Sequence, residues 1–187
     1  MRILTVCTGN ICRSPLVERL LRAGLADDGV TVESGGTHGL VGEPMQPPSQ
    51  ALLEQHGGDA TGFVARRLTS QMVAEADLVL ALTRWHRSEI AQLHPRATRY
   101  TFTLRELARI VPSLTPLPGS TPAERLQALV PAAAARRGFE PVADPADDDV
   151  VDPYRREQAV YDEMASVVVP AVRVLVDAAQ GRTPDGA

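Results

Sequence analysis

The sequence predicts an α/β fold, with an open four-stranded parallel sheet and helices on both faces. Strand-like and helix-like segments alternate along the chain, which is the pattern of parallel strands joined by crossover helices. Residues 77–82 form a near-continuous apolar run of strand length, as expected for a strand that helices cover on both sides. With 187 residues and 44% apolar content, the chain can bury one sizeable core.

The first part of the chain alternates between strand and helix signals. A short buried strand is expected first, and Pro15 suits the first turn of the helix that follows it. A second alternating segment leads into a Gly-rich stretch that predicts a flexible loop, and Gly57-Gly58 ends the next helix. The predicted elements are strand 2–6, helix 15–25, strand 30–33, loop 34–39 and helix 49–56.

The middle of the chain continues the same alternation. Helical patterns flank the apolar run, and Thr103 with Glu106 forms a capping box that opens a helix. The predicted elements are helix 69–76, strand 77–82, helix 84–93, strand 98–102 and helix 103–111.

The alternation of strand and helix signals ends after residue 111. Residues 112–149 are predicted to be an insertion of mostly helical and loop character. A second capping box, Thr121 with Glu124, starts a helix for which we expect a break at Pro131 and an end at Gly138. An acidic loop follows at 144–149. An amphipathic helix at about 157–179, containing Pro170, closes the fold.

The stretch Cys7-Thr8-Gly9-Asn10-Ile11-Cys12-Arg13-Ser14-Pro15 joins the first strand to the first helix. Such a loop gathers unpaired backbone N–H groups, and the helix dipole adds partial positive charge. This combination predicts a phosphate-binding loop after the first strand. A cysteine that opens this loop is held in a field that stabilises its thiolate, which makes Cys7 a candidate nucleophile.

Neighbouring residues in the loop fit this interpretation. The planar guanidinium of Arg13 can grip two phosphate oxygens. Thr8 and Gly9 let the backbone approach the anion, and Asn10 tolerates a left-handed conformation. The hydroxyl of Ser14 is predicted to donate to the Cys7 sulfur.

Asp152 is the candidate proton donor. An oxygen that leaves phosphorus needs a proton, and a carboxylic acid on a loop is the usual donor. The following Pro153 restricts the backbone of Asp152. An ordinary turn is the alternative interpretation of an Asp-Pro pair.

These residues together resemble the low-molecular-weight protein tyrosine phosphatases. The resemblance rests on the loop from Cys7 to Pro15 and on Asp152-Pro153-Tyr154 far downstream. Residues 34–37, Ser-Gly-Gly-Thr, and the pair Ala65-Arg66 are similar to two further motifs of the family. The resemblance covers roughly residues 1–111 and 150–180 and implies a single phosphatase domain over residues 1–187.

The resemblance implies a role for each of these residues. Cys7 would form a phosphocysteine, Arg13 would hold the phosphoryl group, and Asp152 would act first as acid and then as base. Cys12 would form a reversible disulfide with Cys7 under oxidation. Asn10, Ser14 and Ser34 would support the loop by hydrogen bonds. Ile11, Leu40 and Tyr154 would grip a phenyl ring by apolar contacts. No metal and no cofactor are implied.

The chain departs from the family pattern at two places. Phe63-Val64 stands where members often have a histidine before the Ala-Arg pair, and Leu82-Thr83 stands where many have Met-Asp. The first departure removes part of the usual supporting network. A role for residues 112–149 as a lid or docking element is left open beside an inert insertion.

Three other functions fit the sequence less well. Arsenate reductases share the loop but relay a disulfide through further cysteines, and Cys7 and Cys12 are the only cysteines here. Protein-arginine phosphatases tend to carry threonine where Ile11 stands. A phosphate-binding or phosphocarrier module of another class would not need Asp152.

Composition indicates the compartment and the partners. With a net charge of −4, the chain lacks the excess of positive charge that is typical of nucleic-acid-binding proteins. No stretch of the sequence is apolar and long enough to insert into a membrane. The chain begins without a signal-peptide pattern, so we expect a cytoplasmic protein. By family analogy, we expect a phosphotyrosine protein as its partner, with a tyrosine kinase as one candidate. Scattered histidines make a metal site unexpected.

Overall fold

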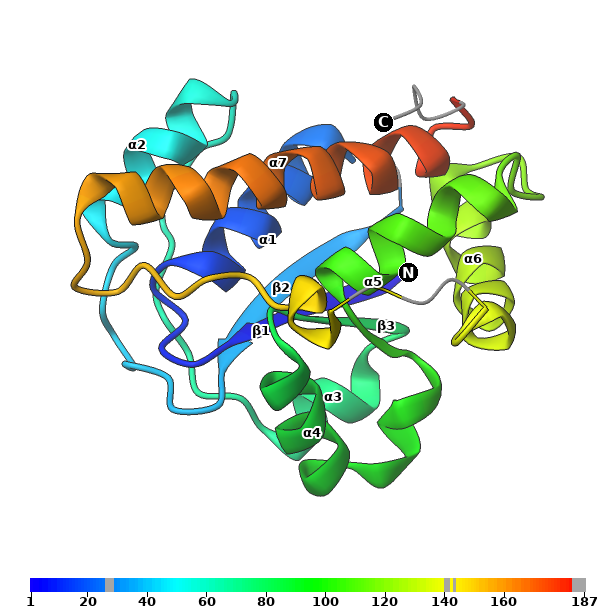
Figure 1. Ribbon diagram of the computed structural model, residues 1–187, viewed down its shortest axis with the longest axis horizontal. Coiled ribbons are helices and arrows are strands. Elements are labelled where there is room, and N and C mark those ends of the chain that lie inside the picture. The colour runs from blue at the N-terminus through cyan, green and yellow to red at the C-terminus, as the bar shows by residue number, and fades with distance from the viewer. Residues whose placement is uncertain (26–28, 140–141, 143, 183–187) are drawn as a thin grey trace.

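The computed structural model describes residues 1–25, 29–139, 142 and 144–182. In that part of the chain, the strands form one parallel sheet in the order β2-β1-β3-β4 (Figure 1). The strands are β1 (Arg2–Cys7), β2 (Thr31–Gly36), β3 (Leu78–Ala81) and β4 (Thr101–Thr103). The predicted fold class is confirmed.

Helices cover both faces of the sheet, with α1, α5 and α7 on one side and α3 and α4 on the other (Figure 1). Helix α2 packs on α1 and α7, and α6 lies at the far end of this layer. The helices are α1 (Arg13–Gly24), α2 (Pro47–Gln55), α3 (Ser70–Glu75), α4 (Arg84–Leu93), α5 (Leu104–Ile110), α6 (Pro122–Arg136) and α7 (Gln158–Ala179). In the described residues, short 3₁₀ helices join them: η1 (Pro95–Arg99), η2 (Val111–Leu114) and η3 (Pro145–Asp148).

The apolar strand residues divide between two cores because side chains alternate along a strand. On β3, Leu78 and Leu80 join the larger core beneath α1, α5 and α7, whereas Val79 and Ala81 join the smaller core beneath α3 and α4. This division explains why residues 77–82 read as continuously apolar.

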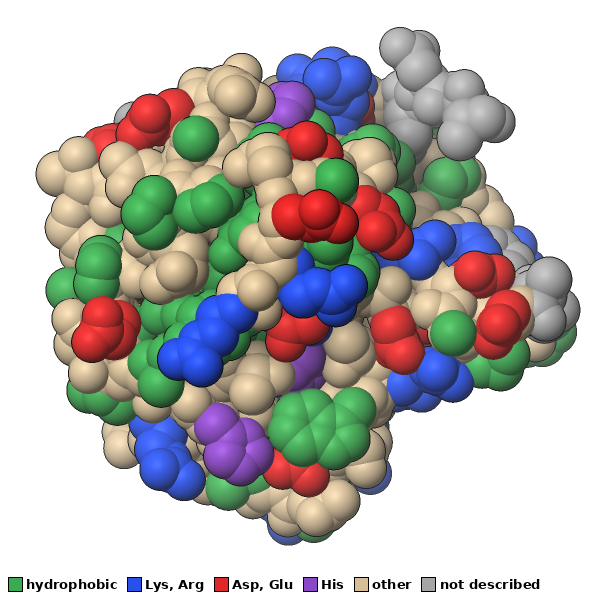
Figure 2. All heavy atoms as spheres, turned by 60° about the vertical axis from the view of Figure 1, so that its left-hand side comes forward, with side chains coloured by type: hydrophobic (Ala, Val, Ile, Leu, Met, Phe, Trp, Pro, Cys, Tyr) green, Lys and Arg blue, Asp and Glu red, His purple; other side chains and the backbone are tan. Residues whose placement is uncertain are grey.

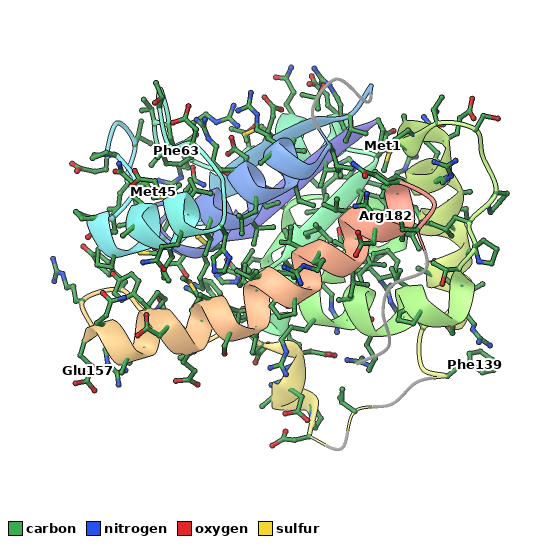
Figure 3. All side chains as sticks on the ribbon, turned by 90° about the horizontal axis from the view of Figure 1, so that it is seen from above. Met1, Met45, Phe63, Phe139, Glu157 and Arg182 are labelled. Atoms are coloured by element: carbon green, nitrogen blue, oxygen red, sulfur yellow. The ribbon has the colours of Figure 1, made fainter. Side chains whose placement is uncertain are left out.

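Helix α7 is a long helix across the larger core, with Glu157 just before its first residue and Arg182 just beyond its last (Figure 3). Its buried stripe includes Val160, Met164 and Leu175, in line with the predicted amphipathic pattern. In the larger core it packs against α1, α2, α5 and α6, so it ties helix α6 to the N-terminal half of the chain.

Three predicted boundaries were wrong. Residues 34–36 belong to β2 rather than to a loop, because Gly35 and Gly36 pair with the end of β1. Residues 95–99 form η1, since Pro95 favours a tight turn there, so β4 starts only at 101. Helix α6 continues through Pro131 without a break, because Leu126, Leu129 and Ala133 bury their side chains along the same face. Both predicted capping boxes are confirmed.

We find no helix in the described ranges that combines the length and the apolarity needed to cross a bilayer.

Candidate active site

The loop between β1 and α1 turns its backbone N–H groups toward its own centre. Backbone N–H groups of residues 37–46 donate, at 2.8–3.0 Å, to four loop carbonyls: those of Cys7, Thr8, Gly9 and Ile11. In a planar trans peptide the following N–H points the opposite way, so the N–H groups of residues 8, 9, 10 and 12 face inward. Cys12, the N-cap of α1, makes no side-chain cap, so its side chain leaves the first amides of the helix available to another acceptor. The loop is therefore shaped to bind an anion.

The Cys7 thiol lies in the middle of these donors. Its side chain is buried, its Sγ is 3.0 Å from the Ser14 Oγ, and it accepts a hydrogen bond from the Asn10 backbone N–H at 3.3 Å. The predicted contact between Ser14 and Cys7 is confirmed. Both contacts fix the position of the Sγ atom at the base of the loop.

Asn10 supports the loop from behind. It has the left-handed backbone conformation that the sequence predicted, with φ of 57°. Its side-chain amide donates to Ser14 Oγ at 2.9 Å and to Ser34 Oγ at 2.8 Å, and its Oδ1 accepts from the Arg66 backbone N–H at 2.8 Å. Arg66 thus reaches Asn10 through its backbone, although the preceding histidine of the family pattern is absent.

A buried carboxylate, Glu18, completes this network, and the sequence analysis missed it. Ser34 donates to Glu18 Oε2 at 2.5 Å, while Glu18 Oε1 pairs with Arg22 at 3.2 Å and with Arg19 at 3.4 Å. Glu18 lies one helical turn beyond Ser14, and that i, i+4 spacing is the signal that could have revealed it.

Arg13 and Asp152 meet at the wall of the site although 139 positions separate them in sequence. The Arg13 guanidinium donates to Asp152 Oδ2 at 2.6 Å and to the Val150 carbonyl at 3.1 Å. Its side chain is almost fully buried, and its Nε has no hydrogen-bond partner among the described residues. A buried donor without a partner is costly, so this Nε favours an anion in the loop.

Cys12 differs from Cys7 in its surroundings. Burial raises the pKa of the Cys12 thiol to about 11, despite a contact of 3.9 Å with the Tyr161 hydroxyl. It is therefore a neutral thiol near pH 7, unsuited to act as the nucleophile. Both cysteines are free in this structure.

A pocket opens above the loop, on the edge of the molecule that comes forward in Figure 2, where arginine, carboxylate and histidine side chains gather beside apolar ones. Ile11, Leu40 and Tyr154, the predicted gripping residues, all line it, together with His38. Its volume is about 160 Å³, comparable to a cavity of about 150 Å³ that holds a benzene ring.

His86 is the second residue that the sequence analysis missed. It is buried on α4, with Nδ1 2.7 Å from Thr83 Oγ1 and Nε2 2.9 Å from Thr8 Oγ1. Burial, aided by the positive charge of Arg13, lowers the pKa of His86 to about 3. Its place directly after β3, beside the carboxyl end of β1, could have indicated that it reaches the loop.

The predicted site residues therefore lie in one place, with the loop at the base, Ser34 behind it, and Leu40, Asp152 and Tyr154 around the pocket. Among the residues that the structure describes, no cluster of three His, Cys, Asp or Glu side chains could hold a metal ion.

Fold and site together define a class: α/β proteins that carry a thiol inside a phosphate-binding loop. Residues 2–112 match the model described as low molecular weight phosphotyrosine protein phosphatase, and the chain belongs to that family.

Individual relatives agree with this assignment. The chain is 44% identical to the low molecular weight protein-tyrosine-phosphatase Etp of Escherichia coli K12 over 93 residues, which are 50% of this chain and 62% of Etp. It is 29% identical to the probable low molecular weight protein-tyrosine-phosphatase EpsP of Ralstonia nicotianae over 180 residues, 92% of this chain and 97% of EpsP. Among solved structures, the YwlE arginine phosphatase from Geobacillus stearothermophilus aligns with a TM-score of 0.68 at 25% identity, covering 96% of this chain and 92% of that one.

Proposed function

We propose that the protein is a phosphomonoesterase that hydrolyses phosphotyrosine in proteins through a phosphocysteine intermediate. The observation that carries this proposal is the placement of the Cys7 Sγ in the anion loop with Arg13 and Asp152 beside the same pocket. A nucleophile, an oxyanion clamp and a proton donor are the three groups that such a reaction needs.

In the first step, the Cys7 thiolate attacks phosphorus while the bond to the leaving oxygen breaks. Inward N–H groups and Arg13 hold the phosphoryl oxygens as charge is redistributed in the transition state. The Asp152 carboxylic acid gives its proton to the phenolic oxygen. This step yields a phosphocysteine, a phenol and the Asp152 carboxylate.

In the second step, water attacks the phosphocysteine and Asp152 takes up a proton from that water. The sulfur–phosphorus bond breaks, which releases inorganic phosphate and restores the thiolate. Ser14, within hydrogen-bond distance of Sγ, stabilises the departing sulfur.

The pocket supports an aryl ester as the substrate. Ile11, Leu40 and Tyr154 provide apolar surface for a phenyl ring, and the cavity has the volume for one. Phosphoarginine is the competing substrate, because YwlE is similar in structure. The apolar Ile11, rather than a threonine, favours the flat aromatic ester.

The test is steady-state hydrolysis of phenyl phosphate and of a phosphotyrosine peptide by the wild type and by Cys7→Ser, Arg13→Ala and Asp152→Ala, with phosphoarginine as the competitor. We expect loss of turnover in the Cys7 variant and a decrease of roughly 10²–10⁴-fold in the Asp152 variant. Undiminished turnover in Cys7→Ser would overturn the mechanism, and preferred hydrolysis of phosphoarginine would overturn the substrate class. A phosphorylated enzyme that never releases phosphate would indicate a carrier.

We also propose a cytoplasmic setting, from the lack of a signal-peptide pattern, and by family analogy a tyrosine kinase as one substrate. Trapping of phosphoproteins on Asp152→Ala, followed by mass spectrometry, tests the second statement. A trapped set without any kinase would contradict it.

A further inference from the structure

The residues just before Asp152 are held by arginines from two helices. Asp149, the last residue of the inserted segment 112–149, accepts a hydrogen bond from the Arg84 backbone N–H at 2.7 Å and from its guanidinium at 3.0 and 3.3 Å. The Asp149 carbonyl accepts from the Arg105 guanidinium at 3.2 Å. We call this group, Arg84, Arg105 and Asp149, the clasp.

The clasp joins the insertion to the helices that surround the site. Arg84 opens α4, directly after the end of β3, and Arg105 lies in the first turn of α5. In Figure 1, η3 lies beside α5 and the chain continues from it toward the start of α7. One residue earlier, Asp148 pairs with Arg109 at 2.6 Å. Several independent contacts therefore fix the chain at one point.

From the clasp, two further backbone bonds lead to Asp152. The Val150 N–H donates to the Leu82 carbonyl at 2.9 Å, and the Val150 carbonyl accepts from Arg13 at 3.1 Å. Asp152 itself is half exposed, and its carboxylate accepts hydrogen bonds from Arg13 and from the Tyr154 backbone N–H. The position of its carboxyl group thus depends on how the preceding residues are anchored.

We propose that Asp149 is a positioning residue, which holds Asp152 in place for proton transfer to the leaving group and gives the inserted segment a role in the reaction. This inference rests on the proposed function. Three residues span at most about 10 Å, so a released Asp149 would allow shifts of ångströms at Asp152. A misplacement of about 1 Å can cost on the order of 100-fold in rate.

A positioning role requires a strong contact, and the clasp provides one because the Asp149 carboxylate and the Arg84 guanidinium carry opposite charges. Burial raises the pKa of Asp149, but the hydrogen bonds and charge of Arg84 hold it below its usual range, so the carboxylate stays ionised near neutral pH. Replacing it by asparagine keeps the size of the side chain and removes the charge that binds the guanidinium.

The first experiment compares phenyl phosphate, a poor leaving group, with p-nitrophenyl phosphate, a good one. The parameter is kcat/KM, which covers the steps up to phosphoenzyme formation. Asp149→Asn and Arg84→Gln should lower kcat/KM roughly tenfold for phenyl phosphate and less than about twofold for p-nitrophenyl phosphate, because only the poor leaving group needs the acid. Arg84→Lys, which keeps the charge and the backbone N–H, should retain most of the activity.

Glu75→Gln is the matched control, because it breaks an exposed ion pair with Arg2 at the opposite end of β1. It should change neither substrate's kcat/KM. Should Asp149→Asn fail to fold, Arg105→Gln carries the same test by removing the bond to the Asp149 carbonyl alone.

The second experiment places Asp149→Asn in the Asp152→Ala background. If Asp149 acts through Asp152, the double variant should have the same kcat/KM as Asp152→Ala with both substrates. Independent, multiplicative losses would overturn the inference, as would equal losses for both leaving groups in Asp149→Asn alone. If Asp152→Ala itself shows no dependence on the leaving group, the proposed acid fails and the role of Asp149 fails with it. If Asp152→Ala shows that dependence and the Asp149 variants do not, only the role of Asp149 is overturned.

Discussion

Replacing His86 by glutamine should make the protein less sensitive to acid. His86 is buried with its two ring nitrogens bonded to Thr83 and Thr8, and its pKa lies at about 3 rather than 6.5. The charged groups that act on it are Arg13, which lowers this pKa, and Asp149, which raises it. Burial is the larger effect.

The expected change follows from the difference between the native and unfolded pKa. As the pH falls below about 6.5, the unfolded chain binds a proton at His86 and the native protein does not, so the free energy of unfolding decreases. The slope approaches about 1.4 kcal/mol per pH unit, and the loss reaches about 2 kcal/mol at pH 5. Above pH 7 the effect vanishes.

At pH 7.5 the glutamine variant should be the less stable protein. It cannot replace both ring hydrogen bonds, which together contribute about 1–3 kcal/mol. Because the variant lacks the titrating ring, the two free energies of unfolding should converge near pH 5. Other titrating groups are common to both proteins and largely cancel in the difference.

Urea unfolding followed by circular dichroism at pH 7.5, 6 and 5 measures this difference. His56→Gln, at the exposed end of α2, controls for the substitution itself. A difference in free energy that stays constant from pH 7.5 to pH 5 would show that His86 is not held neutral in the native protein, and would refute the reasoning.

Further predictions concern the loop and its supports. Ser14→Ala removes the donor to Cys7 Sγ, so breakdown of the phosphoenzyme should slow and kcat should fall roughly tenfold, with a visible burst of phenol in stopped flow; an unchanged kcat would contradict this. Gly36→Ala places a Cβ 2.4 Å from a loop carbonyl oxygen and should cost about 3 kcal/mol in thermal unfolding, whereas Gly35→Ala meets the end of a flexible methionine and should cost less; equal costs would argue against this packing. Peroxide should oxidise Cys7 to a sulfenic acid that the Cys12 thiol converts, with loss of water, to a disulfide; Cys12→Ser should make inactivation irreversible, and mass spectrometry that finds only sulfonic acid in the wild type would reject the pair.

Local sequence sufficed wherever the chemistry and its support are close together along the chain. The contact between Ser14 and Cys7 was predicted, because one strand end and one helix start contain both residues. Both capping boxes were predicted for the same reason, since their partners are three residues apart.

Boundaries that depend on distant partners were predicted less well. Ser34 to Gly36 carry turn residues, but pairing with β1 extends the strand through them. Pro131 costs a helix one hydrogen bond, but packing of α6 against the core maintains the helix. In both cases tertiary contacts outweigh local preference.

The sequence by itself determined that this chain forms a parallel α/β sheet and carries a thiol in a phosphate-binding loop, because strand periodicity and the loop motif are local properties. Only the tertiary structure revealed the residues that join the site from outside the recognised motifs. Parallel strands bring their carboxyl ends to one edge of the sheet, so His86, which follows β3, contacts Thr8 in the loop after β1, and Asp149 pairs with Arg84 at the start of α4. No spacing rule encodes those meetings, since they depend on the order of the strands and on the packing of α4, α5 and α7 around them.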